Sequence, residues 1–375
     1  MKILFVAPRF HTNLVQLIKM LQEKKHQVYF HVATTGPTED HNHVTPINYK
    51  QSRLSRLLEK ITGKGVNARF YFPRLMHYWK AFKALKPDMV VIRDPYKLFP
   101  FTAALYARLI KAKIVFYTQE DLFRSRTKKT IFKQKLMLRF FKAAWMTPIK
   151  SNGKEKNEKI GPMYYIPLPV AVEAQHNPAN AVNGEGPKLL MIGKYHQERK
   201  KHLLFLKALS QLKDKYPFKV TIAGECANDE QRAKLTKLQD AVNDLGLTDR
   251  IEFKQNVPYK QMPELYASHH VFVLPAINEQ YGVSVNEALG YGLPVICTDT
   301  CGAKFNICNG DNGFVVKSNS HDDLATALEN VIRDNQRLNQ MRENSLQYAK
   351  DNLSTNIFYL KFSNLVSERF SLSTN

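Results

Sequence analysis

The chain repeats one pattern twice, and this pattern limits the folds it can adopt. Short apolar runs at residues 2–7, 28–32 and 89–92 are separated by segments in which leucine and isoleucine recur at helical spacing. A second series of apolar runs and helical segments begins at Lys188 and reaches Val316. Alternation of this kind predicts parallel, doubly wound sheets covered by helices. We therefore expect an α/β protein with two Rossmann-like domains that face each other across a cleft, where ligands bind.

Composition and the first residues exclude several classes of protein. With 44% hydrophobic residues the chain is globular, and its longest apolar stretch, near residues 98–110, is shorter than a membrane span and contains Arg108. Pro8 and Arg9 come too early for a signal-peptide core, so we expect a cytoplasmic protein. The four cysteines form no Cys-x-x-Cys pair, which favours reduced structural thiols over a metal site.

The positive charge is confined to the first half of the chain. Up to Val170 there are 32 Lys and Arg against 10 Asp and Glu, and the remainder has 23 of each, so the first half carries the whole net charge of +22. The excess is densest in residues 51–150, where basic residues such as Lys64, Arg69, Arg124 and Arg126 alternate with aromatic ones such as Trp79. Basic and aromatic residues together are typical of a membrane interface, so we expect an anionic membrane surface as a partner. A solvated basic face is the simpler alternative.

Two glutamates eight residues apart, Glu279 and Glu287, flank a Tyr-Gly step. If Val283 or Ser284 begins a helix, Glu287 lies near its first turn and free backbone N–H groups point between the two carboxylates. Such a helix end can bind phosphate, and carboxylates can bind sugar hydroxyls. Spacing alone favours an ordinary loop glutamate followed by a helix that carries another.

The loop that follows the first strand of the second half is rich in cations. Lys194, Arg199, Lys200 and Lys201 follow an apolar run that ends near Gly193. Cations at the carboxyl end of a strand can neutralise a diphosphate. The alternative is a solvated basic turn.

From Gly193 to about Asp334 the chain resembles the carboxyl-terminal domain of the family 4 (group 1) glycosyltransferases, which have the GT-B fold. The resemblance depends on the order of several short motifs over about half the chain, none of them specific alone. They are Gly193-Lys194 with Lys200, Thr221-Ile-Ala-Gly224, Asp249-Arg-Ile-Glu-Phe253, Glu279 to Glu287, Glu287-Ala-Leu-Gly-Tyr-Gly-Leu-Pro-Val-Ile296 and Asn312-Gly-Phe314.

The resemblance implies a role for each matching residue in a nucleotide-sugar site. Catalytic roles fall to Glu279, which would bind donor-sugar hydroxyls, to Lys194 and Lys200 at the diphosphate, and to Gln119. Donor binding would use Glu287 at the ribose, together with Tyr281, Gly282, Val283, Ser284, Arg199, Gly224 and Asn256. The resemblance further implies a retaining reaction without a cofactor or an essential metal. It also implies domains at 1–170 and 171–352, with a helix at 353–375 that returns toward the first domain.

The first domain differs from the family pattern at two turns. Its first turn contains His11, Thr12 and Asn13 where the family often has Gly-Gly, and we assign these three residues to the acceptor side. Gln119 stands where the family often has His; an amide forms hydrogen bonds but is no base near neutral pH.

The sequence thus predicts a glycosyltransferase, peripheral on the inner face of the cytoplasmic membrane. It would transfer a sugar from a nucleotide-sugar donor to a glycan or glycolipid acceptor in the biosynthesis of lipopolysaccharide or another polysaccharide. Three alternatives stay open: a nucleic-acid-modifying glucosyltransferase, a non-catalytic binding subunit of this fold and an epimerase. A nucleic-acid partner is disfavoured because the chain has no base-reading motif. The sequence identifies neither the donor base, the sugar nor the acceptor.

Overall fold

The computed structural model describes residues 1–35, 39, 41–62, 70–121, 127–150, 159–160, 163–173, 182 and 185–371. The chain divides into two compact units, which we call unit 1 (Met1–Pro169 with Thr355–Asn375) and unit 2 (Val170–Ser354). Lys64, Arg69, Arg124 and Arg126 of the basic region lie outside the described residues, as does the side chain of Thr12.

Unit 1 is built on an eight-stranded sheet with the order β3-β2-β1-β4-β5-β6-β8-β7. Only the β7–β8 pair is antiparallel among the pairs described. The order reverses between β1 and β4, which lie side by side although two strands separate them in sequence. The strands are β1 (Lys2–Arg9), β2 (Gln27–Thr34), β3 (Ile47–Asn48), β4 (Met89–Arg93), β5 (Lys113–Tyr117), β6 (Ala144–Thr147), β7 (Lys159–Ile160) and β8 (Met163–Tyr165).

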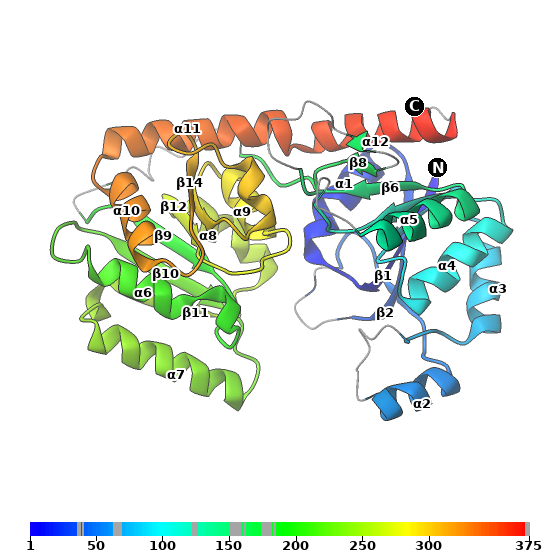
Figure 1. Cartoon of the computed structure of the whole chain (residues 1–375), viewed down its shortest axis with the longest axis horizontal. Helices are drawn as coiled ribbons and strands as arrows, with labels where there is room; N and C mark the ends of the chain where they lie inside the picture. The colour runs from blue at the N-terminus through cyan, green and yellow to red at the C-terminus, as the bar shows by residue number, and fades with distance from the viewer. Residues whose placement is uncertain are drawn as a thin grey trace. The chain divides into compact units, whose positions relative to one another are not determined.

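Helices cover the sheet of unit 1, and the last helix of the chain is one of them. The helices are α1 (Val15–Glu23), α2 (Arg53–Thr62), α3 (Leu75–Leu85), α4 (Leu98–Leu109), α5 (Lys128–Phe141) and α12 (Thr355–Phe370). Figure 1 shows both chain ends within this unit, where α12 runs beside α1. The Lys24 ammonium lies 5.1 Å from the centre of the Tyr359 ring, and Arg369 Nε donates to the Ala143 carbonyl at 3.0 Å. The C-terminal helix therefore packs on unit 1.

Unit 2 is a six-stranded, fully parallel sheet with the order β11-β10-β9-β12-β13-β14. Its strands are β9 (Lys188–Ile192), β10 (Lys219–Gly224), β11 (Ile251–Gln255), β12 (Val271–Leu274), β13 (Val295–Thr298) and β14 (Gly313–Val316). Its helices are α6 (His202–Ser210), α7 (Asp229–Asp244), α8 (Met262–Ala267), α9 (Val283–Gly290), α10 (His321–Ile332) and α11 (Asn335–Asn352).

Both faces of the unit 2 sheet are buried. Leu189 and Met191 of β9 pack into a cluster with α6, α7 and α10, while Leu190 packs into a second cluster with α8, α9 and α11. Alternate residues of one strand point to opposite faces, so a strand covered on both sides must be apolar throughout. This explains the continuous apolar runs in the sequence.

Candidate active site

The unit 2 sheet has a topological switch point, where the order of the strands reverses, and two loops come together there. β9 and β12 pair in the middle of the sheet, although β10 and β11 lie between them in the chain. The loop from Gly193 to Lys201 follows β9, and the loop that contains Glu279 follows β12. Parallel sheets bind ligands at the carboxyl ends of strands that diverge in this way.

Glu279 lies at the centre of a charge cluster that these two loops form. Its Oε2 atom accepts from Arg199 Nη1 at 2.5 Å and from Lys200 Nζ at 2.7 Å. A backbone hydrogen bond from Ile277 N to Arg199 O, at 2.8 Å, joins the loops directly. The backbone also holds Glu279 through Gly302 N, which donates to its carbonyl at 2.9 Å. The carboxylate and its two cations are therefore fixed by main chain as well as by charge.

Burial of Lys200 limits where its ammonium can lie. The residue is only 9% exposed, and its aliphatic stem covers Gly193. A Cβ atom at Gly193 would lie 3.1 Å from Lys200 Cγ, so a side chain there would displace the lysine. Gly193 thus allows the lysine stem to lie flat on the end of β9 while its charged end reaches Glu279.

The Glu279 carboxyl is ionised at neutral pH despite its position. Burial alone would raise its pKa, but Lys200 and then Arg199, through charge and hydrogen bonds, hold the pKa below its usual value. An ionised carboxylate is an acceptor only, which suits binding to the hydroxyls of a sugar.

Lys194 belongs to a different ion pair. It contacts Glu225, which follows β10, and its side chain is 43% exposed. Tyr195 beside it donates to the carbonyls of Ile222 at 3.0 Å and Lys254 at 2.7 Å. Lys194 thus lies toward β10, while Lys200 and Arg199 lie toward β12, so the structure places the predicted cations in two groups.

The helix predicted after the Tyr-Gly step is α9, and Val283 is its first residue. Gly282 precedes it with φ at +75°, and a Cβ atom there would lie 2.7 Å from the Cys301 sulfur. Glycine is therefore required by conformation and by space. Val283 and Ser284 are half-exposed at the first turn, where backbone N–H groups have no partner within the helix. Tyr281 is buried.

Glu287 lies one turn into α9 and accepts from the Tyr266 hydroxyl at 2.8 Å. Burial raises the pKa of Glu287, and the bond from Tyr266 opposes the shift. Tyr266 also stacks on Tyr291, with ring centres 5.3 Å apart. The sequence did not point to Tyr266, because nothing in its short helix marks one side chain for a glutamate 21 residues later.

Gly224 and Asn256 shape the loop after β10. A Cβ atom at Gly224 would lie 2.5 Å from the Gly193 carbonyl oxygen, so the ends of β9 and β10 approach closely there. The Asn256 amide binds the Cys226 backbone twice, accepting from its N–H at 2.8 Å and donating to its carbonyl at 2.9 Å. The Asn256 side chain therefore holds this loop in place.

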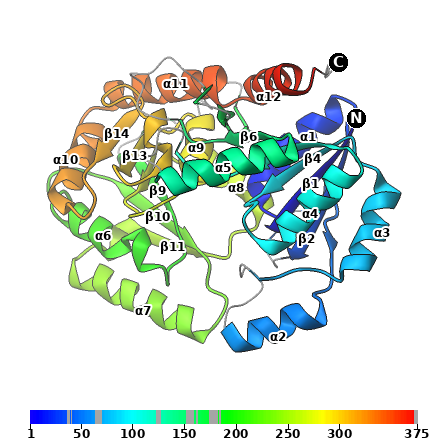
Figure 2. The same ribbon diagram turned by 45° about the vertical axis from the view of Figure 1, so that its right-hand side comes forward.

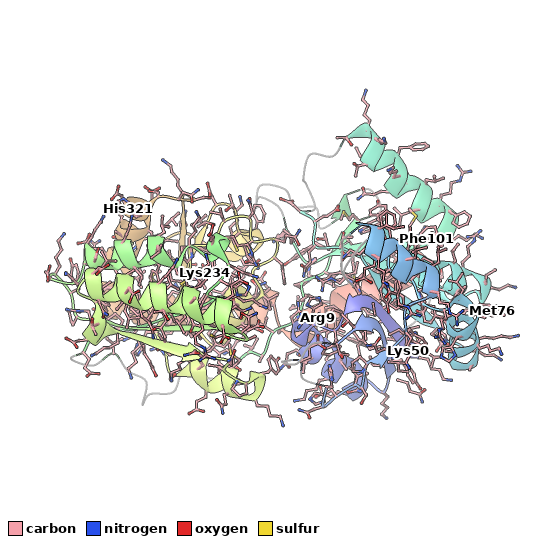
Figure 3. All side chains as sticks on the ribbon, turned by 90° about the horizontal axis from the view of Figure 1, so that it is seen from below. Arg9, Lys50, Met76, Phe101, Lys234 and His321 are labelled. Carbon is pink, nitrogen blue, oxygen red and sulfur yellow. The ribbon has the colours of Figure 1, made fainter. Side chains whose placement is uncertain are left out.

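The carboxyl edge of the unit 1 sheet carries His11 and Asn13, which were assigned to the acceptor side, and Gln119, which was assigned a catalytic role. His11 and Asn13 follow β1, and Gln119 follows β5 and accepts from Arg93 Nη2 at 3.4 Å. Burial, and then the charges of Arg93, Arg9 and Lys97, lower the pKa of His11 to about 3, so its imidazole is neutral. Figure 3 labels Arg9 at the end of β1.

Arg93 is a residue of this edge that was not predicted. It ends β4, and its guanidinium lies 5.7 Å from the centre of the Tyr117 ring. Arg93 Nη1 and Asn13 Oδ1 are buried, and neither has a hydrogen-bond partner in the described part of the chain. The sequence feature that could have indicated Arg93 is its position directly after the apolar run Met89–Ile92.

Two further features bear on the predicted chemistry. Among the described residues, no three His, Cys, Asp or Glu side chains gather as they would around a metal ion. No helix in the described ranges is long and apolar enough to cross a membrane.

Comparison with known proteins identifies this architecture. A family model described as glycosyl transferases group 1 matches residues 172–348. A D-inositol 3-phosphate glycosyltransferase of Corynebacterium kroppenstedtii is 27% identical over 149 residues, which are 39% of this chain and 33% of that protein. The chain thus spans about a third of the length of this curated relative.

Solved structures extend the similarity in fold to the whole chain. A glycosyltransferase of Rickettsia africae superposes with a TM-score of 0.75 at 17% identity, covering 99% of each chain. A protein of Anabaena solved in complex with UDP and glucose superposes with a TM-score of 0.67 at 15% identity, covering 98% of this chain and 100% of its own. The fold is GT-B, and residues 172–348 of this chain match the glycosyl transferases group 1 family.

Proposed function

We propose that the chain is a retaining glycosyltransferase that uses a nucleotide-diphosphate sugar as its donor. The observation that supports this most strongly is the cluster of Glu279, Lys200 and Arg199 at the switch point of unit 2, in a domain of the group 1 family. The solved relative with bound UDP and glucose supports the same class of donor.

The three parts of the donor correspond to three features of unit 2. Glu279, held ionised, accepts hydrogen bonds from sugar hydroxyls, and Glu287 accepts them from the ribose. A lysine ammonium has three donors, so Lys200 can keep its bond to Glu279 and still give two to the diphosphate. The free N–H groups of Val283 and Ser284 serve the same phosphates. Lys194, paired with Glu225, acts nearer β10.

In the reaction, the bond between the anomeric carbon and the phosphate oxygen breaks while the acceptor oxygen forms its bond on the same face of the sugar. The acceptor hydroxyl gives its proton to a leaving phosphate oxygen. Negative charge grows on the diphosphate, and Lys200 with the start of α9 stabilises it. Because these protein cations supply positive charge at the leaving group, the proposed reaction needs no metal ion. Gln119 contributes hydrogen bonds only.

The acceptor we propose is a lipid-linked or surface glycan, such as lipopolysaccharide, at the inner face of the cytoplasmic membrane. The support lies in unit 1, whose sequence carries the positive charge of the chain together with many aromatic residues. His11 and Asn13 at the end of β1, with Arg93 and Gln119 nearby, provide donors and acceptors for glycan hydroxyls.

Two measurements test this proposal: binding of the donor and the stereochemistry of the transfer product. A thermal-shift panel of UDP-, GDP- and ADP-sugars should yield one class that stabilises the protein, and NMR of the transfer product should show the anomeric configuration of the donor. The matched control is Lys254→Ala, which removes an exposed lysine of the same unit and should leave both results unchanged. Failure of every nucleotide-sugar to stabilise the protein would exclude the proposed donor site, and an inverted product would exclude retention.

A further inference from the structure

The outer side of α5 carries an apolar stripe that nothing in the described chain covers. The helix buries Gln134, Leu138 and Phe141 against the core. On its opposite side Phe132, Leu136 and Phe140 are 67%, 56% and 47% exposed. These three residues are spaced by four, so they form one row on the helix surface. Figure 2 shows the length of α5 at the front of unit 1.

Every charged residue of α5 is basic. Lys128, Lys129, Lys133, Lys135 and Arg139 are all exposed, and no described carboxylate pairs with any of them. At about 100° per residue, Lys128, Lys135 and Arg139 lie on one flank of the stripe and Lys133 on the other. An apolar row between basic flanks is typical of a helix that lies in the plane of a membrane surface.

A basic hollow adjoins the carboxyl end of this stripe. Its volume is about 670 Å³, and none of the described residues that line it is acidic. Arg108 connects the two features, because its guanidinium donates to the Phe140 carbonyl and lies 4.5 Å from the centre of the Phe140 ring. The charged and aromatic lining residues are Arg108, Lys111, Lys113, Phe141, Lys142, Arg369 and Phe370.

Three lysines at this edge of the sheet have a conformation that lysine rarely adopts. Lys86, Lys111 and Lys142 follow α3, α4 and α5 with φ of +46°, +62° and +50°. Glycine is usual at such a position, because a side chain is strained there. The gain from placing a cation at a helix carboxyl end is smaller than that strain. The left-handed turns close these helices with backbone hydrogen bonds, such as those from Lys86 N to Phe82 O and from Lys142 N to Arg139 O, and at Lys111 and Lys142 they place a cation at the hollow.

We propose that the outer side of α5 and the basic hollow together bind the surface of an anionic phospholipid bilayer. Phe132, Leu136 and Phe140 would enter the boundary between headgroups and acyl chains, and the cations of the hollow would bind lipid phosphates. This inference deepens the proposed function, on which it rests for its biological purpose, by naming the surface that meets the membrane.

The exposed apolar row favours a bilayer over a nucleic acid. A nucleic-acid site needs cations for the phosphates and flat rings for stacking, but an aliphatic side chain such as Leu136 gains little there. At a bilayer, aliphatic and aromatic side chains both contribute binding free energy.

Co-sedimentation with vesicles tests the surface. Wild-type protein should bind vesicles of equal parts phosphatidylglycerol and phosphatidylcholine, and bind pure phosphatidylcholine poorly. Phe132→Ser with Leu136→Ser keeps the charge and should weaken binding about tenfold or more. Lys111→Gln with Lys142→Gln should weaken it about thirtyfold at low salt. The changed side chains lie at the surface, and thermal melting checks that each variant is folded.

Two matched controls give the test its specificity. Leu203→Ser with Lys207→Gln alters an exposed apolar–basic pair on α6 of unit 2, and should change vesicle binding less than twofold. Leu54→Ser with Leu57→Ser removes the exposed leucines of α2, a second amphipathic helix of unit 1, and should have a similarly small effect. The proposal is overturned if the double variant of α5 loses no more vesicle binding than the double variant of α6, or if the double variant of α2 loses more than that of α5. It is also overturned if the protein binds duplex DNA more tightly than vesicles and the change at Phe132 leaves DNA binding unaltered.

Nucleotide-sugar binding, measured on the same preparations, separates this inference from the proposed function. Wild-type protein that binds a nucleotide-sugar but does not bind anionic vesicles would refute the surface alone. Vesicle binding without any donor binding would refute the proposed activity and leave the surface in place.

Discussion

The sheet edge of unit 2 and the outer side of α5 in unit 1 use positive charge in opposite ways. In unit 2 the cations near the sheet edge are matched by acids, as in Glu279 with Arg199 and Lys200, and Lys194 with Glu225. Even on the surface of unit 2, Lys234 of α7, which Figure 3 labels, is paired with an acid: its Nζ atom lies 3.8 Å from Glu198 Oε1. In unit 1 the helix α5 and the hollow at its end have no such matching acids among the described residues. Paired charge orients groups inside a site, whereas unmatched charge attracts a partner from outside.

Removal of a lysine should therefore have very different effects in the two units. Lys200→Ala should lower kcat/KM by about 100-fold or more, because it deletes the buried cation proposed to stabilise the leaving diphosphate. Lys135→Ala on α5 should leave turnover of a soluble acceptor within about twofold, since exposed charges interact weakly with a distant site. Steady-state kinetics measure both. Near wild-type turnover by folded Lys200→Ala protein, or a large loss in Lys135→Ala, would break the contrast.

The matched charges of unit 2 also depend on close packing around Gly282. Gly282→Ala should destabilise the protein by about 2–4 kcal/mol, because it combines left-handed strain with overpacking against Cys301. Gly310→Ala is the control, with φ at +82° but no atom nearer than 3.6 Å to the new methyl group, and should cost about 1–2 kcal/mol. Urea denaturation gives both values. Equal losses would show that space beside Cys301 is unimportant.

The smallest expected effect is the pH dependence of the free energy of unfolding that Glu279 contributes. Since the folded-state pKa of Glu279 is lowered, its charge contributes stability that is complete above the unfolded-state glutamate pKa of about 4.3 and is lost as pH falls through the folded-state value. The difference in unfolding free energy between wild type and Glu279→Gln should accordingly be greatest near neutral pH and shrink in acid. Denaturation curves across this range provide the measurement. A difference that grows as pH falls would mean that Glu279 is not held ionised by its two cations.

Much of the fold and part of the site follow from local sequence. Strands buried on both faces appear as apolar runs, so β9 and β12 and the loops after them could be located. The predicted residues Glu279, Arg199 and Lys200 come together because those loops follow neighbouring strands. The short strands β3, β7 and β8 contain too few residues to show a period.

Other parts of the site depend on distant packing. Lys194 turns to Glu225, and Tyr266 reaches Glu287, only because separate helices and strands meet in the folded unit. Arg93 is similar, since its contact with Gln119 depends on the pairing of β4 with β5. Periodicity and spacing describe single elements and contain no information about such encounters.

The lysines that end α3, α4 and α5 have a consequence for engineering this protein. Glycine at Lys86, Lys111 or Lys142 would relieve about 1–2 kcal/mol of strain at each position. The same replacements would remove the cations proposed to meet lipid phosphates at Lys111 and Lys142. The same replacement at Lys111 or Lys142 would therefore raise stability and lower membrane affinity. Selection for heat resistance alone should favour glycine at these positions and so weaken membrane binding.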